Sequence, residues 1–168
     1  VEAAGQRLVG NNFTLAGATV GSLTIAKTGS ISNPKLGEMG AKVAEFTIAS
    51  GSSEDVTLKR LTLYQAGNLN ASNISNLTLK QAGLTLATAP GFDSKLHATF
   101  DMPAGFLLAK GQTKTFQVYA DIGGTARAND DLKLYVEEDA DLYGVGSTFG
   151  YGATVTRTNY NGSTCAAT

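Results

Sequence analysis

The sequence has little charge and no long hydrophobic run. Charged residues make up 16% of the 168 residues, against about 25% in typical soluble proteins. The formal net charge is −1, and acidic and basic residues are interspersed. A nucleic-acid-binding protein would concentrate lysine and arginine in a stripe, and a membrane-spanning helix would need about 20 apolar residues in a row. The sequence therefore argues against nucleic-acid binding and against a transmembrane segment.

Tryptophan is absent, and cysteine and histidine each occur once. Cys165 is the single cysteine, so no disulfide can form within the chain and the core must supply the stability. We expect this thiol to have no role; the alternative is an intermolecular bridge in an exported protein. His97 is the single histidine, which argues against a Ser-His-Asp triad, a Cys-His pair and a zinc site. The sequence therefore predicts a protein that is not an enzyme, with His97 on the polar face of a strand.

The pattern that is present is period-two alternation, which predicts β-strands. The heptapeptide Leu-Thr-Leu-x-Gln-Ala-Gly occurs twice, at 61–67 and 77–83. Because the copies are so close together, they predict neighbouring strands of one sandwich rather than repeated domains. The full set of predicted strands is 12–20, 22–28, 42–49, 56–64, 74–81, 84–88, 95–100, 113–122, 132–137 and 151–158.

One predicted strand, 56–64, changes phase in its middle. Val56 and Leu58 have one parity, whereas Leu61 and Leu63 have the other. Without a correction, the apolar residues of the second half would face solvent. We therefore expect a β-bulge near residues 59–60, because one extra residue restores the inward direction of the side chains.

Turns rich in Gly, Asn, Ser and Pro separate the strands at intervals of roughly 8–12 residues, which is typical of a β-sandwich. The sequence therefore predicts a single domain over 1–168 with an all-β, antiparallel, Ig-like sandwich fold. Its core is expected between about 43 and 136. Extended arms are expected on both sides, an N-terminal arm at 1–20 and a C-terminal arm at 143–168 that is rich in Gly, Tyr and Thr.

Two segments carry a resemblance to known proteins. One is VTLKRLTLYQAGNLNASNISNLTLKQAG at 56–83, and the other is FDMPAGFLLAKGQTKTFQVYADI at 100–122. The region 42–136 around them resembles the β-sandwich modules of prokaryotic surface-layer and other cell-surface proteins. The resemblance covers a little over half of the chain. It implies a structural or adhesive role at a cell surface, and it implies no catalytic residues.

A weaker resemblance concerns the N-terminal region. Some extracellular fibres are polymers of β-sandwich subunits in which a terminal strand completes the sheet of a neighbour. The segment 12–25, NFTLAGATVGSLTI, alternates well enough for such β-strand addition. The alternative is an ordinary first strand of the chain's own sandwich. The candidate assembly residues are Phe13, Leu15, Val20, Leu23 and Ile25.

Acidic residues cluster near the end of the predicted core. Hard cations such as Ca²⁺ take six to eight oxygen ligands from carboxylates and carbonyls of this kind. The cluster lacks the glycine and the spaced glutamate of an EF-hand loop, so a solvated acidic loop is the competing interpretation. Calcium is the one cofactor considered, and the candidate ligands are Asp130, Asp131, Glu137, Glu138, Asp139 and Asp141.

Several Asn-x-Ser/Thr triplets are candidates for N-glycosylation, and none has proline in its middle position. In a chain this rich in Asn, Ser and Thr, some triplets will occur by chance. Asn70 and Asn73 lie in the connection between the two heptapeptides and are the preferred candidates. The complete set is Asn70, Asn73, Asn76, Asn12 and Asn161.

Together these features predict a non-enzymatic extracellular structural protein, a self-assembling subunit of a surface filament (a pilus-like fibre) or a surface layer. Its partners would be copies of itself, joined by strand pairing of a terminal arm. A secretion signal would be absent from this chain or already removed. The alternative is an adhesive or carbohydrate-binding module, because aromatic side chains stack on sugars; the candidates in the tail are Tyr143, Phe149, Tyr151 and Tyr160. A hydrolase is disfavoured because the residues for a catalytic site are missing.

Overall fold

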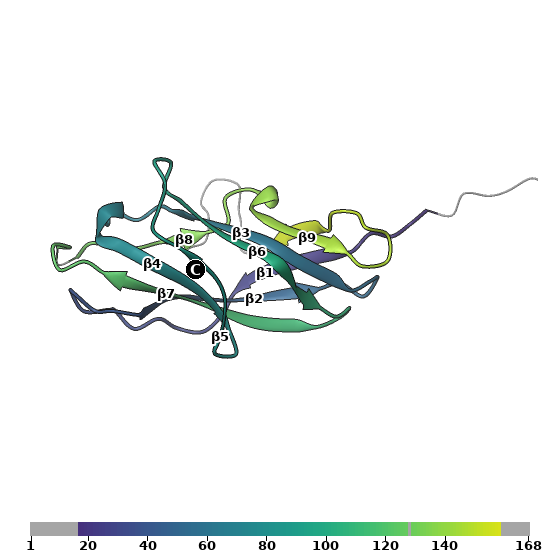
Figure 1. Ribbon diagram of the computed structural model, residues 1–168, viewed down its shortest axis with the longest axis horizontal. Coiled ribbons are helices and arrows are strands. Elements are labelled where there is room, and N and C mark those ends of the chain that lie inside the picture. Colours follow the sequence, from purple (N-terminus) through teal and green to yellow (C-terminus); the bar gives the residue numbers. More distant parts are fainter. Residues whose placement is uncertain (1–16, 128, 159–168) are drawn as a thin grey trace, which may run out of the picture.

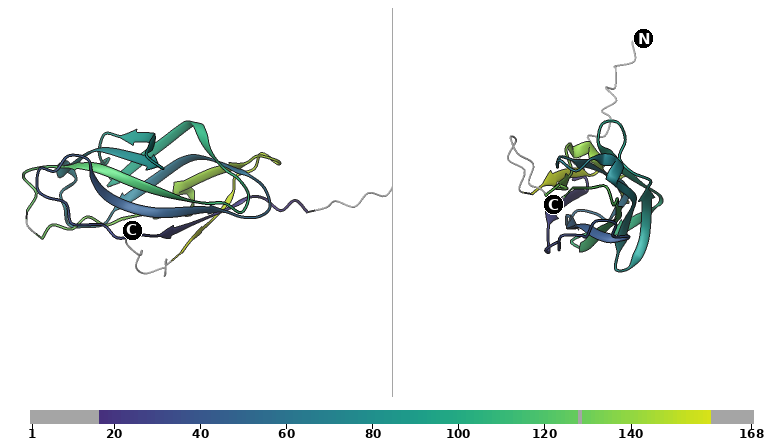
Figure 2. Two further views of the ribbon diagram at one scale, coloured as in Figure 1. Left: turned by 90° about the horizontal axis from the view of Figure 1, so that it is seen from below. Right: turned by 90° about the vertical axis from the view of Figure 1, so that its left-hand side faces the viewer.

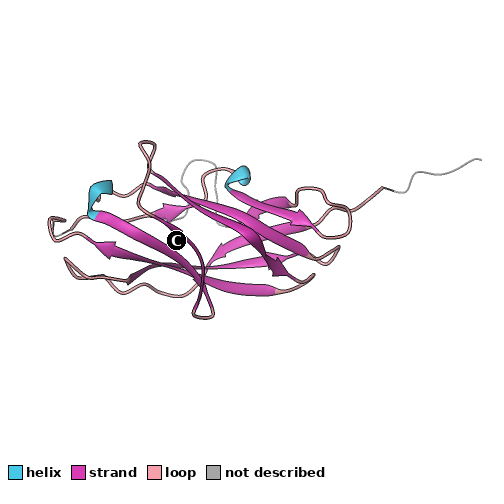
Figure 3. Cartoon of the chain, viewed as in Figure 1, coloured by secondary structure: helices cyan, strands magenta, loops and turns pink. Residues whose placement is uncertain are grey.

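The computed structural model describes residues 17–127 and 129–158. These residues form an all-β, sandwich-like fold of two sheets (Figure 1), which confirms the predicted fold class; its Ig-like detail stays a prediction. The strands are β1 (Ser22–Lys27), β2 (Ala41–Ser50), β3 (Val56–Gln65), β4 (Ile74–Gln81), β5 (Leu84–Ala89), β6 (His97–Leu108), β7 (Thr113–Ile122), β8 (Leu134–Tyr135), β9 (Leu142–Gly146) and β10 (Thr154–Arg157). Two 3₁₀ turns, η1 (Ala71–Asn73) and η2 (Asp139–Asp141), complete the secondary structure (Figure 3).

The larger sheet has six strands in the order β10-β1-β2-β7-β4-β5. In the smaller sheet, β6 pairs with one edge of β3, while β8 and β9 pair with different parts of its other edge. All these pairings are antiparallel except β1–β10, which is parallel. The two sheets face each other along the length of the molecule (Figure 2). The edges of the larger sheet are therefore β10 on one side and β5 on the other.

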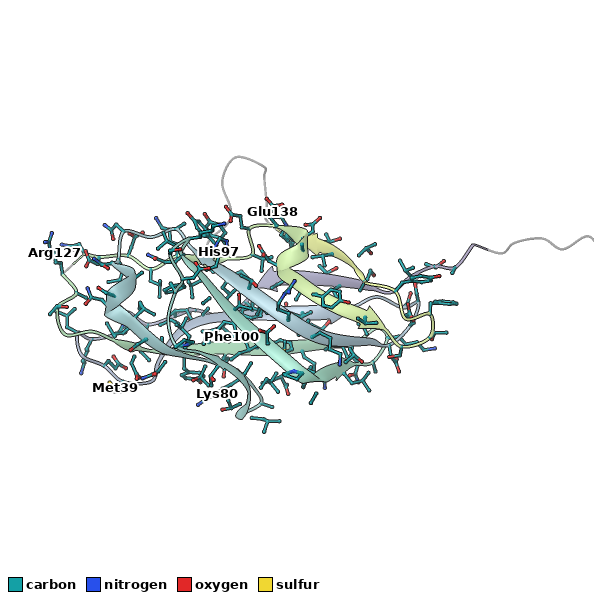
Figure 4. All side chains as sticks on the ribbon, turned by 45° about the horizontal axis from the view of Figure 1, so that its top comes forward. Met39, Lys80, His97, Phe100, Arg127 and Glu138 are labelled. Carbon is teal, nitrogen blue, oxygen red and sulfur yellow. The ribbon has the colours of Figure 1, made fainter. Side chains whose placement is uncertain are left out.

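The core lies between the sheets and follows from the alternation in the sequence. Inward residues of β2 and β7 are buried, and the rings of Phe46 and Phe116 stack at 5.9 Å. Phe106 crosses from the smaller sheet and meets the Phe116 ring edge-on at 5.4 Å. Phe100, labelled in Figure 4, is also fully buried. Phe116 therefore contacts aromatic rings from both sheets.

The predicted bulge in β3 is confirmed. The pairing of β3 with both β6 and β9 shifts register between Leu58 and Arg60. Val56, Leu58, Leu61 and Leu63 are all fully buried as a result. The extra residue thus keeps one strand facing the core over its whole length.

The two heptapeptide copies are neighbours in sequence but do not pair. The first copy ends β3 in the smaller sheet, and the second ends β4 in the larger sheet. Their glycines have different tasks. Gly83 has φ +82° and closes the two-residue β4–β5 hairpin, as expected for a primed turn. Gly67 instead passes against the backbone of Asp131, where an added Cβ would collide with the carbonyl oxygen.

The expected C-terminal arm is wrong for residues 143–157. β9 is bonded to β3, and β10 is bonded to β1, so this stretch belongs to the sandwich. The sequence signal is weak because two inward positions of β9 are glycines. A Cβ on Gly144 would lie 2.9 Å from a methyl group of Leu23 in the other sheet, and one on Gly146 would collide with Glu54. Close approach between sheets replaces the large apolar side chains that mark a strand.

The expected N-terminal arm is also shorter among the described residues. Residues 17–20 form no strand, and β1 begins at Ser22. β1 is paired on both sides, with Leu23 fully buried and Ile25 nearly so. The structure thus places these two assembly candidates in the chain's own core. This agrees with the alternative interpretation, in which the segment is an ordinary first strand of the chain's own sandwich. Phe13 and Leu15 lie outside the described residues, as does most of the predicted strand 12–20.

The two ends of the sandwich differ. Residues 17–20 leave the sandwich at the end that we call the exit end, on the right of Figure 1. The β9–β10 connection lies at the same end. The opposite end, which we call the open end, is formed by the connections β1–β2, β3–β4 and β7–β8 (Figures 1 and 2).

We predict that Phe116→Ala lowers the free energy of unfolding by about 3–5 kcal/mol, the usual cost of deleting a buried aromatic ring. The cost arises because Phe116 is fully buried and contacts rings of both sheets. Urea denaturation followed by circular dichroism measures it. Phe149→Ala is the matched control, since that ring is 46% exposed; equal losses in the two variants would contradict the assignment of the core.

Candidate functional site

The open end holds a pocket with a volume of about 630 Å³, within the roughly 300–1,000 Å³ range of ligand pockets. Its apolar lining includes Ile31, Leu36, Val43, Leu69 and Ile122. The polar part of its lining includes Arg127, Asp130 and Asp131. The pocket therefore has an apolar floor and a charged rim.

The core is incompletely closed at this pocket. Val43, Leu69, Ile122 and Ala126 keep exposed fractions of 6–8%, whereas core residues in the middle of the sandwich, such as Phe46, have none. Leu36 at the rim is 55% exposed. Met39 is exposed nearby, and Figure 4 places it at the same end as Arg127. The apolar side chains of Leu36 and Met39 thus reach solvent at the open end, while the core residues that line the pocket stay more than nine-tenths buried.

The opening exists because β1 is shorter than its neighbour β2. β1 pairs with the second half of β2, from Phe46 onward. The last contact is between the Thr28 nitrogen and the Glu45 carbonyl oxygen at 3.2 Å. Residues 41–44 of β2 pair with β7, and no described strand pairs with their other edge. This edge of residues 41–44 thus has no strand partner among the described residues, but Ala41, Val43 and Ala44 are at most 7% exposed, so it is covered from solvent.

Asp121 fixes the backbone at the start of β2. One oxygen accepts a hydrogen bond from the Gly40 nitrogen at 2.7 Å, and the other accepts one from Nδ2 of Asn76 at 2.7 Å. These bonds, from the Asn76 amide first and the Gly40 N–H second, hold the pKa of Asp121 below its usual value. The Ile122 nitrogen also donates to the Glu38 carbonyl oxygen at 2.8 Å. The floor of the pocket is thus held by bonds from three segments.

Glu54 organises the exit end. Its carboxylate is buried and accepts hydrogen bonds from the backbone nitrogens of Gly21 at 2.8 Å, Thr148 at 2.7 Å and Phe149 at 3.3 Å. Burial opposes ionisation of this carboxyl, but the three N–H groups outweigh it and hold the pKa of Glu54 below its usual value. One side chain therefore ties the start of β1 to the β9–β10 connection.

Arg157 closes one side of the sandwich between β10 and η2. Its Nε donates to Asp139 at 2.8 Å. Its Nη1 donates to the carbonyl oxygens of Val136, at 3.3 Å, and Glu137. Because β10 has no fully buried residue, this side chain is a main attachment of the strand to the rest of the fold.

The candidate calcium ligands are not brought together. Asp131 pairs with Lys133 at 2.7 Å, Asp139 pairs with Arg157, and Glu137 lies 3.1 Å from the His97 ring. Glu138 and Asp141 form a capping box at the start of η2, in which the Asp141 carboxylate accepts from the Glu138 nitrogen at 2.8 Å. Asp130 accepts from the Arg127 nitrogen at 2.8 Å. Within the described ranges, no group of three or more Asp, Glu, His or Cys side chains could hold a metal ion.

The glycosylation candidates differ in how their amides are used. Asn70 is exposed and caps η1 by accepting from the nitrogen and hydroxyl of Ser72. Asn73 is half-buried and accepts from the Thr125 hydroxyl at 2.6 Å. The side-chain nitrogen Nδ2 of Asn76 donates to Asp121, so a glycan on Asn76 would disrupt this hydrogen bond at the pocket floor. Asn12 and Asn161 lie outside the described residues.

His97 lies on the outer face of the smaller sheet, as predicted, but within a row of rings. The Tyr64 ring lies 5.2 Å from the His97 ring and 5.3 Å from the Tyr135 ring. The His97 side chain also faces Glu137 at 3.1 Å and Asp93 at 3.9 Å. Sequence reasoning missed this row, because nothing in the spacing of these residues shows that β3, β6 and β8 are adjacent.

Three of the four aromatic candidates in the tail are exposed at or near the exit end. Tyr143 lies on β9, beneath the guanidinium of Arg60 at 5.9 Å from its centroid. Phe149 and Tyr151 lie in the β9–β10 connection, and Tyr151 is the more exposed of the two. Tyr160 lies outside the described residues. The described aromatics thus form an exposed set beside the segment that leaves the sandwich.

Comparisons with known proteins do not assign the chain to a group. No protein-family model matches it, and no curated protein matches it either. Within residues 17–127 and 129–158, no helix has the length and apolar character needed to cross a bilayer. The function is therefore argued from the two ends of the sandwich.

We predict that Glu54→Gln lowers the melting temperature at neutral pH and weakens its dependence on acid pH. The pKa of Glu54 is depressed in the folded state, so its stabilisation is present above the unfolded value of about 4.3 and is lost as pH falls through the folded value. Glutamine cannot accept three N–H bonds as a carboxylate does. Thermal unfolding between pH 2 and pH 7 measures both effects.

Asp101→Asn is the control for this experiment, since Asp101 is exposed and its removal should leave the profile of melting temperature against pH unchanged. Some acid dependence will remain in Glu54→Gln, because the pKa values of Glu45, Asp93, Asp121 and Asp131 are also lowered by hydrogen bonds. A Glu54→Gln profile that coincides with the wild-type profile would refute the assigned role.

Proposed function

We propose that this chain is a non-enzymatic, extracellular structural protein that assembles with copies of itself, end to end, into a filament. The observation that carries the proposal is the difference between the two ends. The chain leaves the sandwich at the exit end, whereas the open end carries a pocket of about 630 Å³ with the exposed Leu36 in its lining. Ends of different kinds suit a head-to-tail contact.

A head-to-tail contact uses two different surfaces, so each added copy presents a fresh surface for the next. Such contacts generate rings when the rotation between copies closes and open filaments when it does not. The exit and open ends lie at opposite ends of the long axis (Figure 1). Copies stacked along that axis would not close on themselves, which favours a filament.

Composition supports an extracellular location and a structural role. The chain is poor in charge and rich in Thr, Ser and Asn, and Asn70, the first residue of its triplet, is exposed and could carry a glycan. The single histidine and single cysteine argue against a Ser-His-Asp triad or a Cys-His pair. The proposed assembly needs no cofactor; a calcium ion at a joint between copies would be an addition to it, tested by chelation.

The proposal predicts that the purified full-length chain forms filaments whose mass grows with concentration. Negative-stain electron microscopy shows their shape, and light scattering coupled to size-exclusion chromatography measures their mass. Asp101→Asn and other exposed substitutions away from the ends should leave assembly unchanged. A chain that stays monomeric at high concentration, across salt and pH, would refute the proposal.

A second function, binding of carbohydrate, is favoured by the exposed Tyr143, Phe149 and Tyr151 at or near the exit end. Aromatic faces at the surface can stack on sugar rings. Under this alternative the chain stays monomeric, and Tyr151→Ala lowers glycan affinity by roughly tenfold, a typical loss for one aromatic contact. Glycan-array binding of the two proteins measures it; unchanged binding would exclude this set.

A further inference from the structure

We infer that the two ends meet through an aromatic contact, in which the exposed rings of Phe149 and Tyr151 at the exit end of one copy enter the open-end pocket of the next copy. The occupant of the pocket is thus a second copy of this chain. This inference rests on the proposed function and names the side chains that its head-to-tail contact uses.

The first argument is the position of the exposed apolar side chains. Seven large apolar side chains are exposed among the described residues, and four of them lie in only two connections. Phe149 and Tyr151, which are 46% and 62% exposed, lie in the β9–β10 connection at the exit end. Leu36 and Met39, which are 55% and 71% exposed, lie in the β1–β2 connection at the open end. Exposed apolar surface marks interaction sites, and here it gathers at both ends of the long axis (Figure 1).

The second argument is that hydrogen bonds hold the β9–β10 connection in place. The Gly146 nitrogen donates to the Tyr151 carbonyl oxygen at 2.9 Å, and the Gly150 nitrogen donates to the Gly146 carbonyl oxygen at 3.0 Å. The buried Glu54 carboxylate accepts from the Phe149 nitrogen at 3.3 Å. A segment that is already ordered loses little conformational freedom on contact, which favours binding. Both rings are therefore presented by a preorganised support.

The third argument is charge. Residues 147–153 and 17–21 contain no charged side chain, so these two segments of the exit end can be covered without desolvating a charge. At the open end, Arg127 lines the pocket and is exposed. Arginine is the cation found most often over the face of an aromatic ring, and Arg60 already lies over Tyr143 within the chain. The pocket thus offers an entering ring both apolar surface and a guanidinium.

The fourth argument is size. A pocket of about 630 Å³ lies in the range that encloses drug-sized molecules, which are larger than a single aromatic side chain. Ile31, Pro34 and Leu36 in its lining supply apolar contacts. A fully covered aromatic side chain buries about 150–250 Å², whereas a standard interface buries about 800 Å² per partner. The rings therefore form the centre of the contact, where most binding energy is concentrated, and the surrounding parts of both ends supply the rest.

Substitutions in either surface of the full-length chain test the inference. Phe149→Ala combined with Tyr151→Ala removes the rings, and Leu36→Glu places a charge in the pocket lining, where burial without a partner is costly. Each change should raise the concentration needed for assembly, measured by light scattering, by at least about tenfold. All three positions are exposed, so the melting temperature should stay close to that of the wild type. Normal assembly of either variant would overturn the inference.

Each variant has a matched control. Tyr143→Ala removes an exposed ring from the outer face of β9, and Leu84→Glu adds a charge at the exposed start of β5. Both controls should assemble like the wild type. Losses of assembly in the controls as large as those in the variants would also overturn the inference, since the effect would then follow the type of substitution rather than these two surfaces.

A mixture of the two variants gives a more direct readout. The double alanine variant keeps an intact open end, and Leu36→Glu keeps an intact exit end. At a concentration where neither assembles alone, an equimolar mixture should form one-to-one dimers that grow no further, because each pair retains one intact contact. A mixture that stays monomeric would contradict the inference.

The wild type separates this inference from the proposed function. If the wild type forms filaments but the double alanine variant or Leu36→Glu assembles normally, this contact is wrong while the proposed function stands. If the wild type forms no oligomers at all, the proposed function and this inference both fall.

Discussion

The fold depends on the packing of two sheets across one apolar layer, since the chain has a single cysteine and so no disulfide of its own to hold the sheets together. Residues from nine of the described strands, β1 to β9, and from several connections contribute to the same cluster. Phe116 stands where aromatic rings of both sheets meet. The polar attachments, such as Glu54 and Arg157, lie at the ends and sides of this layer. They fix the connections and the edge strand to a core that already defines the sandwich.

A mismatch in strand length turns this ordinary core into an asymmetric molecule. β2 and β7 have ten residues each, whereas β1 has six. The layer is therefore sealed in the middle and at the exit end, and it is incompletely covered at the open end. The clamp on Asp121 stabilises the open end in this state, because it bonds the backbone before β2 and the side chain of Asn76. The open end is thus a fixed part of the fold.

Much of the fold could be predicted from the sequence, because alternation marks strands with one buried face. The bounds of β4 and β7 match their predictions, and the change of phase at Leu58 located the bulge. β9 was missed because Gly144 and Gly146 give no apolar signal, although the sheets approach closely there. The pairing of strands was harder to predict from the sequence. The two identical heptapeptides lie in opposite sheets, because the turn that follows each copy depends on tertiary contacts, such as that of Gly67 with the Asp131 backbone. The pocket also depends on which connections meet at one end, which no local pattern reports.

The position of β1 has a mechanical consequence. β1 lies along the long axis between β2 and β10, and it directly follows the residues that leave the exit end. Hydrogen bonds to an antiparallel neighbour are perpendicular to the strands, so tension along the axis at Gly21 would load the β1–β2 bonds together, in shear. Peeling them one after another would require a force across the axis, and Glu54 restrains that motion by holding the Gly21 nitrogen. The molecule is therefore built to resist extension along its length.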